Sequence, residues 1–276
     1  EKQLAIELKY KNIVDTCGTG GDNLSTFNIS TAAALLCAGA GIAVAKHGHR
    51  SVSSKCGSAD LLKAVGVNIE ISRKKIFDCL NKIGIAFIFA QKFQQSWRFA
   101  NGPRREIGAR TLFNILGPLT NPARIKRQVI GVYDPSIMLT LAKVMKELGS
   151  EQVMIVHGED GLDEISITGK SRIVELLNNE ITEYIISPED FRIESAPLNS
   201  IQSSSCEENI RYLDNILAGK NSPAMNVVIL NAAAAIKVSG KVESLADGIN
   251  LAKESAYSGA AKQKFERLIE ITNNIN

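Results

Sequence analysis

Two segments rich in glycine and hydroxyl side chains have the composition of a binding site for a phosphorylated ligand. The first is DTCGTGGDNLSTFNIST, residues 15–31, and the second is KHGHRSVSSKCGSAD, residues 46–60. In the first segment a short apolar run gives way to Gly18, Gly20 and Gly21. Such a turn can adopt positive φ and point its backbone N–H groups at an anion. The sequence therefore predicts an anion-binding loop after a strand.

Further polar residues strengthen this prediction. Asn28, Ser30 and Thr31 precede the run AAALLCAGA, so a helix should begin there and turn its positive end toward the same ligand. The second segment adds two full charges and several hydroxyl donors: Lys46, Arg50, Ser51, Ser53, Ser54 and Ser58. The glycine spacing fits neither the dinucleotide-binding fingerprint nor the Walker A motif. We expect a ligand that carries several phosphates.

An acidic loop, VHGEDGLDEIS, follows a predicted strand later in the chain. It contains Asp163 and Glu164, with Glu159 and Asp160 nearby. Magnesium typically takes one or two protein carboxylates together with substrate phosphates, so this loop and the anion-binding loop could share such an ion. Asp22 could hold the same metal or a sugar hydroxyl, or it could cap its own turn.

Other candidate groups are few. The histidines are His47, His49 and His157, and no Ser-His-Asp triad or H-E-x-x-H motif can be read. For His47 and His157 a structural hydrogen bond is at least as well favoured as catalysis. Arg104, in NGPRREIGARTLFNILGPLTNPA, could hold a carboxylate bidentately or belong to a basic helix face.

Composition indicates an ordinary globular protein. The chain has 276 residues, 45% of them hydrophobic, and a formal net charge of +3 that is spread along the sequence. Nonspecific nucleic-acid binding is therefore not favoured, and no apolar span suggests a membrane segment. Five cysteines without a C-x-x-C pair predict a cytoplasmic protein with reduced thiols. Because the anion-binding loop comes within twenty residues of the first residue, we expect a missing N-terminal portion.

Short β-rich runs alternate with helical runs, which is typical of an α/β fold with a mostly parallel central sheet flanked by helices. The expected strands are residues 13–16, 42–46, 67–71, 85–90, 128–133 and 152–157, with two or three more between 163 and 186. The expected helices start near residues 30, 57, 72 and 135, and the chain from Cys206 onward is mainly helical. We expect a single domain over residues 1–276, with a small helical lobe that includes residues 72–83 and 98–110.

Three groups of motifs resemble the anthranilate phosphoribosyltransferase family. They are GTGGD with NIST, KHGxRSVSS with GSAD, and PRREIGARTLFNILGPLTNPA with the later DGLDE. The resemblance covers nearly the whole chain and implies a helical lobe whose N-terminal part is absent here, and a homodimer. It implies transfer of phosphoribosyl from phosphoribosyl pyrophosphate to the amine of anthranilate, with two Mg²⁺ ions, in tryptophan biosynthesis.

The resemblance also assigns roles by position. The donor-binding residues would be Gly18, Gly21, Asp22, Thr26, Asn28, Ile29, Ser30, Thr31, Lys46, His47, Gly48, Arg50, Ser51, Val52, Ser53, Ser54 and Ser58. The acceptor-binding residues would be Gly18, His49 and Arg104, and the metal ligands would be Ser30, Asp163 and Glu164. It implies no catalytic acid or base, because positioning and electrostatics can supply the acceleration.

The acceptor side departs from the family pattern. Family members usually have asparagine where this chain has His49, and a histidine-containing element where it has Phe93, Gln94 and Gln95. A phosphoribosyltransferase with a different aromatic acceptor is therefore an alternative. A non-catalytic nucleic-acid-binding homologue is a third, which the intact anion-binding loop and low net charge disfavour.

Overall fold

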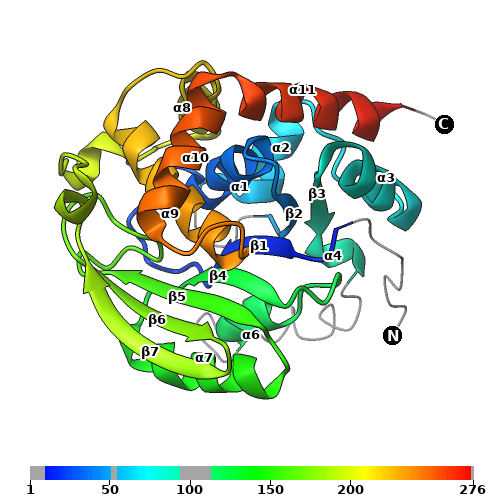
Figure 1. The fold of residues 1–276 in the computed structure, drawn as a ribbon. Coiled ribbons are helices and arrows are strands. Elements are labelled where there is room, and N and C mark those ends of the chain that lie inside the picture. The colour runs from blue at the N-terminus through cyan, green and yellow to red at the C-terminus, as the bar shows by residue number, and fades with distance from the viewer. Residues whose placement is uncertain (1–9, 51–54, 94–112, 275–276) are drawn as a thin grey trace, which may run out of the picture.

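The computed structural model describes residues 10–50, 55–93 and 113–274. A seven-stranded sheet forms its centre, in the order β3-β2-β1-β4-β5-β6-β7 (Figure 1). The strands are β1 (Ile13–Gly18), β2 (Ala43–Gly48), β3 (Ile85–Phe89), β4 (Arg127–Gly131), β5 (Gln152–Gly158), β6 (Ser171–Leu177) and β7 (Glu180–Ile186).

The first five strands are parallel, and β6 and β7 continue the sheet as antiparallel neighbours. Strand order runs outward from β1 in both directions, through β2 and β3 on one side and through β4 and β5 on the other. In such sheets ligands bind outside the carboxyl ends of the strands, where the order reverses. Here that point lies between β1 and β4. The expected mostly parallel α/β fold is confirmed.

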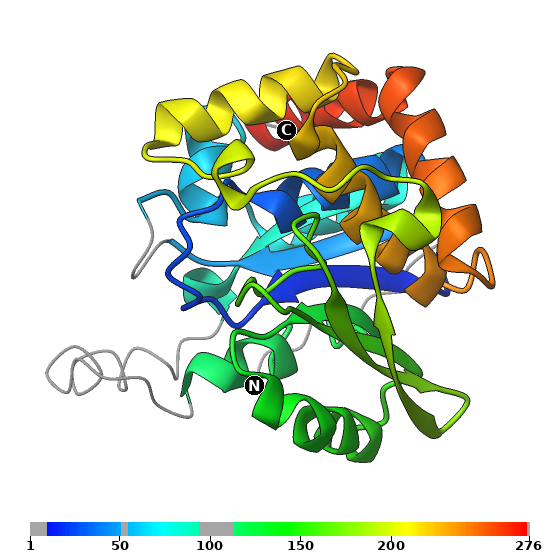
Figure 2. The same cartoon turned by 90° about the vertical axis from the view of Figure 1, so that its left-hand side faces the viewer.

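Helices cover both faces of the sheet (Figures 1 and 2). Those of the larger layer are α1 (Ile29–Gly39), α2 (Ser58–Ala64), α3 (Arg73–Ile83), α8 (Cys206–Leu217), α9 (Pro223–Val238), α10 (Leu245–Tyr257) and α11 (Ala260–Asn273). The opposite face carries α6 (Phe113–Leu119) and α7 (Met138–Glu147). A short helix, α4 (Ala90–Phe93), follows β3, and 3-10 turns lie at Pro135–Ile137, Pro188–Phe191 and Leu198–Ser200.

Helices α1 and α9 lie at the centre of the larger layer and are apolar on nearly all sides. Residues such as Ala33, Cys37 and Ala234 are fully buried. A helix without a polar face belongs inside a protein, and alanine allows helices to approach closely. Accordingly α9 packs between the sheet and α10, and α1 packs against α9 and α11. These two helices therefore have fixed positions relative to the strand ends.

The prediction of a strand over Val67–Ile71 was wrong. Val67, Ile69 and Ile71 are buried and alternate with polar residues, which gives the period of a strand. The segment instead lies beside the end of α11, where the N–H of Asn68 donates to Oγ1 of Thr272. Residues 67–71 therefore alternate between buried and exposed because they lie beside a helix, and they pair with no strand among the described residues.

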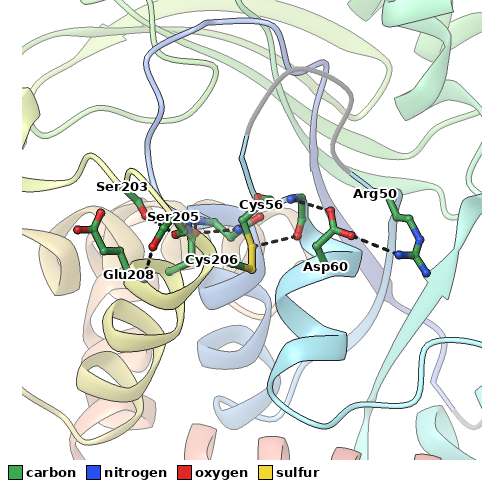
Figure 3. Close-up of a disulfide and its surroundings, with 10 residues drawn as sticks. Arg50, Cys56, Asp60, Ser203, Ser205, Cys206 and Glu208 are labelled. Atoms are coloured by element: carbon green, nitrogen blue, oxygen red, sulfur yellow. Dashed lines mark hydrogen bonds and ion pairs between the residues drawn. A yellow bond between two sulfur atoms is a disulfide. The ribbon is translucent and has the colours of Figure 1, made fainter.

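The expectation that all cysteines are reduced was also wrong. Cys56 and Cys206 form a disulfide, with their Cα atoms 5.1 Å apart (Figure 3). Their sequence separation is 150 residues, so no local spacing could reveal the pair. Cys17, Cys37 and Cys79 are free and buried.

The predicted helical-lobe segments have different outcomes. Residues 72–83 correspond to α3, which packs against β3 and α11, whereas residues 98–110 lie outside the described part of the chain. Helix α3 begins at the N-cap Ser72 and ends at Gly84, which has a φ of 77° as expected for a helix stop. None of the described helices is long and apolar enough to cross a membrane.

Candidate active site

Four parallel strands end in glycine at the same edge of the sheet. They are β1, β2, β4 and β5, which end at Gly18, Gly48, Gly131 and Gly158. The loop after β1 contains the first glycine-rich segment, and the loop after β5 contains the acidic residues. The topology therefore brings the predicted anion-binding and acidic loops to one place.

The loop after β1 has an unusual backbone. Gly20 and Gly21 have φ of 66° and 86°, and Asn23 and Ser25 also have positive φ. Such conformations cost free energy in residues other than glycine, so they need outside support. The N–H of Ser203 donates to the carbonyl of Ser25 over 2.7 Å, and this bond is part of that support.

The anion-binding loop and the acidic loop are in direct contact. The N–H of Gly20 donates to Oδ2 of Asp163 over 2.8 Å. A Cβ on Gly18 would lie 2.5 Å from the same oxygen, and one on Gly131 would lie 1.6 Å from the Asp163 carbonyl oxygen. Glycine is therefore required at both positions because the acidic loop crosses the ends of β1 and β4.

The start of α1 faces Glu164. The backbone N–H of Ser30 donates to the Glu164 carboxylate, as the free N–H groups of a first helical turn can do. Lys46, buried at the end of β2, donates to Oγ of Ser30 over 3.1 Å and to the carbonyl of Thr16 over 2.5 Å. Burial lowers the pKa of Lys46, while the nearby carboxylates, including Glu164, oppose that shift. A cation, a hydroxyl and a carboxylate thus meet at this point.

Two neighbouring carboxyl groups lie in a setting that suits a hard cation. Burial, followed by repulsion from Asp22, raises the pKa of Asp163 to about 7. Burial and repulsion from Asp163 raise the pKa of Glu164 well above its usual range. A divalent cation would relieve this repulsion, and carboxylate and hydroxyl oxygens are the ligands that Mg²⁺ prefers. The residues therefore fit a magnesium site.

Not all of the predicted acidic cluster faces this site. Asp160 accepts from the hydroxyls of Ser166 and Thr168, and Glu159 pairs with Arg172 on the sheet. Both have structural partners, which leaves Asp163 and Glu164 as the carboxylates of this loop that face the candidate site. Asp22 accepts from the N–H of Leu24, which is the predicted capping of its own turn, and it also lies against Asp163.

A buried network behind the site was not foreseen. Asp15 is fully buried and lies 2.5 Å from Nδ1 of His47, and Asn121 donates to it over 2.8 Å. Burial alone would raise the pKa of Asp15, but His47, Lys46 and Asn121 hold it below its usual value. Nε2 of His47 lies 3.0 Å from the carbonyl of Gly117. The side chain of His47 is thus engaged inside the protein, and His157 likewise contacts the carbonyl of Val132.

The second glycine- and hydroxyl-rich segment lies beside the first. The hydroxyl of Ser58 would be 2.3 Å from a Cβ on Gly48, so the start of α2 packs directly on the end of β2. Arg50 pairs with Asp60 at 3.7 Å and lies over the ring of Phe89. The ring of His49 is exposed. The Thr31 hydroxyl is buried without a hydrogen-bond partner among the described residues.

The structure thus brings together most of the predicted site. Contacts join Gly18 and Asp22 to Asp163, Ser30 to Glu164 and Lys46, and Gly48 to Ser58. Gly21, Thr26, Asn28 and Thr31 lie in the loop after β1 or at the start of α1. The side chain of Ile29 is in the core, so only its backbone can reach a ligand. The predictions for Ser51, Val52, Ser53, Ser54 and Arg104 lie outside the described residues.

Comparison with known protein sequences points to one enzyme family. The model of the glycosyl transferase family, a/b domain, matches residues 10–262. The anthranilate phosphoribosyltransferase of Petrotoga mobilis is 48% identical over 273 residues, which is 99% of this chain and 79% of that protein.

Solved structures with the same fold point to the same enzyme family. The anthranilate phosphoribosyltransferase of Thermus thermophilus superimposes with a TM-score of 0.91 at 38% identity, over 97% of this chain and 80% of that one. The Saccharomyces cerevisiae enzyme in complex with PRPP and Mg gives a TM-score of 0.89 at 29% identity, over 97% and 75%. The same yeast enzyme has been solved with 4-fluoroanthranilate. The chain therefore belongs to the anthranilate phosphoribosyltransferase family.

Proposed function

We propose that this chain catalyses Mg²⁺-dependent transfer of the phosphoribosyl group from phosphoribosyl pyrophosphate to the amine of anthranilate, in tryptophan biosynthesis. The observation that carries the proposal is the contact between Gly20 and Asp163, which joins an anion-binding loop to a carboxylate pair suited to magnesium. Complexes of the yeast relative with PRPP and Mg and with 4-fluoroanthranilate support the same substrates here.

The donor would lie across the ends of β1 and β2. Backbone N–H groups around Gly21 and at the start of α1 would bind the phosphate oxygens. Lys46 supplies a buried positive charge, and the hydroxyl of Thr31 supplies an unused donor. The remaining donor contacts would come from Gly18, Asp22, Thr26, Asn28, Ile29, Ser30, His47, Gly48, Arg50, Ser51, Val52, Ser53, Ser54 and Ser58.

Two magnesium ions are part of the proposal. Ser30 and Glu164 would hold one, and Asp163 and Glu164 the other. When bound, magnesium neutralises charge on the departing pyrophosphate. Gly20 and the N–H of Ser30 hold the two carboxylates in place before the metal arrives. The pyrophosphate end of the donor would therefore point toward the acidic loop.

The acceptor would approach the opposite side of the ribose, near Gly18 and His49, with its carboxylate held by Arg104. The new C–N bond would form as the bond from the anomeric carbon to pyrophosphate breaks, with the bonding electron pair leaving on pyrophosphate and the amine proton passing to water. An aromatic amine is a neutral nucleophile, so orientation and electrostatic stabilisation can supply most of the acceleration. No side chain is assigned as a base.

A cytoplasmic location and a homodimer complete the proposal, and family resemblance supports both. Light scattering of the purified chain tests the dimer, and fractionation of the source cells tests the location. A monomer at micromolar concentration, or a membrane or secreted pool, would contradict them.

The reaction is tested by pyrophosphate release from purified, folded protein. We expect release only with phosphoribosyl pyrophosphate, anthranilate and Mg²⁺ together.

A second candidate function is the same transfer to another aromatic acceptor. It is favoured by the exposed His49, which stands where family members usually have asparagine. A screen of aromatic amines distinguishes the two, because the first requires anthranilate to give the highest kcat/KM.

A further inference from the structure

Two asparagines on the helical layer connect it to the two site loops. Asn231 on α9 is 2% exposed, and Asn209 on α8 is 4% exposed. A buried amide costs free energy unless its donors and acceptor are all paired. In both cases the pairing partners lie in, or next to, the segments that form the candidate site.

Asn231 pairs with the backbone of the acidic loop. Its Oδ1 accepts from the N–H of Ile165 over 2.9 Å, and its Nδ2 donates to the carbonyl of Ile165 over 2.9 Å. Nδ2 also donates to the carbonyl of Val227, one turn earlier in α9. Ile165 directly follows Glu164 and lies in the loop between β5 and β6, outside the strand ladder. The amide therefore replaces a strand partner for the residue next to Glu164.

Helix α9 has no need of this asparagine for its own stability. Asparagine is a weaker helix former than alanine or leucine, and here it interrupts the apolar run VVILNAAAAI. A leucine would suit the surrounding core but would leave the N–H and carbonyl of Ile165 unpaired. The placement is therefore explained by what it does for the acidic loop.

Asn209 acts in the same way on the donor side. Its Oδ1 accepts from both the backbone N–H and Nδ2 of Asn28, each over 2.8 Å. Its Nδ2 donates to Oγ of Ser203 and to the carbonyl of Ser205. Asn28 in turn donates to the carbonyl of Cys56, which belongs to the second segment. Figure 3 shows the start of α8, with Ser205 and Cys206, lying against Cys56.

This arrangement explains an oddity of α1. Asn28 stands at its N-cap but makes no capping hydrogen bond with its side chain within the described chain. Its amide is turned to Asn209 and Cys56 instead. The first N–H groups of α1 are thereby left for other partners, of which Ser30 serves Glu164.

We propose that Asn209 and Asn231 are positioning residues for the two halves of the site, an inference that rests on the proposed function. Asn209 fixes the donor-binding loops through Asn28 and Cys56. Asn231 fixes the metal-binding carboxylates through Ile165. Asn231 contacts the acidic loop and Asn209 contacts the donor side, so each substitution should weaken one ligand more than the other.

The test compares Asn209→Leu and Asn231→Leu by titration calorimetry and kinetics. With Mn²⁺ as the metal probe and no donor, Asn231→Leu weakens binding by about 10-fold or more, as loss of an outer-shell partner does. Asn209→Leu weakens Mn²⁺ binding less, because it reaches the metal ligands through Asn28 and the start of α1. At saturating Mg²⁺ the KM for phosphoribosyl pyrophosphate rises about 10-fold in Asn209→Leu, which corresponds to about 1.4 kcal/mol, and stays near wild type in Asn231→Leu.

The controls come from the same helices. Asn226 lies in the first turn of α9 and is partly exposed, and Asn215 on α8 accepts from Nζ of Lys220. Asn226→Leu and Asn215→Leu should leave both ligands unaffected. If a leucine variant does not fold, Asn209→Ser and Asn231→Ser carry the test, since serine keeps a hydroxyl and adds no bulk.

The outcomes are distinct. Equal weakening of both ligands by both variants, or wild-type behaviour in folded variants, overturns the positioning roles. If the wild-type protein itself binds neither Mn²⁺ nor the donor and shows no turnover, the proposed function fails instead.

Discussion

Gly20 donates its backbone N–H to Oδ2 of Asp163 over 2.8 Å, although 143 residues separate the two. The bond joins the loop after β1 to the loop after β5 across the end of β4. Asp163 also lies against Asp22, so its carboxylate has two contacts with the loop after β1. Under the proposed function, the position of this one side chain would couple donor binding to metal binding.

Gly131→Ala tests the close approach of the acidic loop to β4. The new methyl group would fall 1.6 Å from the carbonyl oxygen of Asp163, so the loop must move. Displacement of catalytic groups by about 1 Å can cost about 100-fold in rate, and overpacking can cost about 1–3 kcal/mol in stability. Gly169→Ala, in the same loop, is the control because its Cβ would meet nothing within 4 Å. Full activity of Gly131→Ala would show that the loop does not cross there.

Lys46→Met tests the buried cation. Methionine keeps much of the side-chain volume but removes the hydrogen bonds to Thr16 and Ser30. Hydrogen bonds to charged groups contribute about 1.5–3 kcal/mol, so we expect kcat/KM for the donor to fall about 10- to 100-fold. Lys143→Met, on the outer face of α7, should change nothing. A rise in the acceptor KM alone would argue against a donor role for Lys46.

Arg104→Ala tests the acceptor side, where the prediction comes from the sequence. If the guanidinium holds the anthranilate carboxylate, the KM for anthranilate should rise far more than that for the donor. Steady-state kinetics with each substrate varied in turn measure this. Equal effects on both KM values would indicate a structural role.

The disulfide is tested by counting thiols. The unfolded, unreduced protein should expose three reactive thiols per chain, and reduction should raise the number to five. Cys206→Ser should lower the free energy of unfolding by up to about 5 kcal/mol, because the bridge closes a long loop. With a dithiol reductant present the variant and the wild type should become equally stable. Five reactive thiols before reduction would exclude the bridge.

Local patterns in the sequence were enough to predict the sheet and the meeting of the two loops. Apolar runs that end in glycine or polar residues predicted β1, β2 and β5, and parallel strands bring their carboxyl ends to one edge. Family resemblance named Ser30 and Glu164 as ligands of one metal ion, which stays a prediction, and the structure places the backbone N–H of Ser30 against Glu164. The sequence could not show that Val67–Ile71 packs on a helix, since buried alternation looks the same in both settings.

The missed residues share one property, which is that their partners are distant in sequence. Asp15 is paired with His47 and Asn121, Asn231 with Ile165, and Cys56 with Cys206. Of these residues, Asn231 alone could have been noticed from its neighbours in the sequence. It is a polar residue inside the apolar run of α9, where the helix itself does not need one.

The central claim is that the two loops form one magnesium-dependent donor site, and Asp163→Asn combined with Glu164→Gln tests it most directly. Both amides preserve shape and remove charge, so the repulsion between the two carboxylates disappears and thermal stability should not fall. Initial rates of phosphoribosyl-anthranilate formation, measured with and without Mg²⁺, should be magnesium-dependent in the wild type. In the folded double variant they should fall by at least about 100-fold. A double variant that retains the wild-type rate and its magnesium dependence would contradict the account.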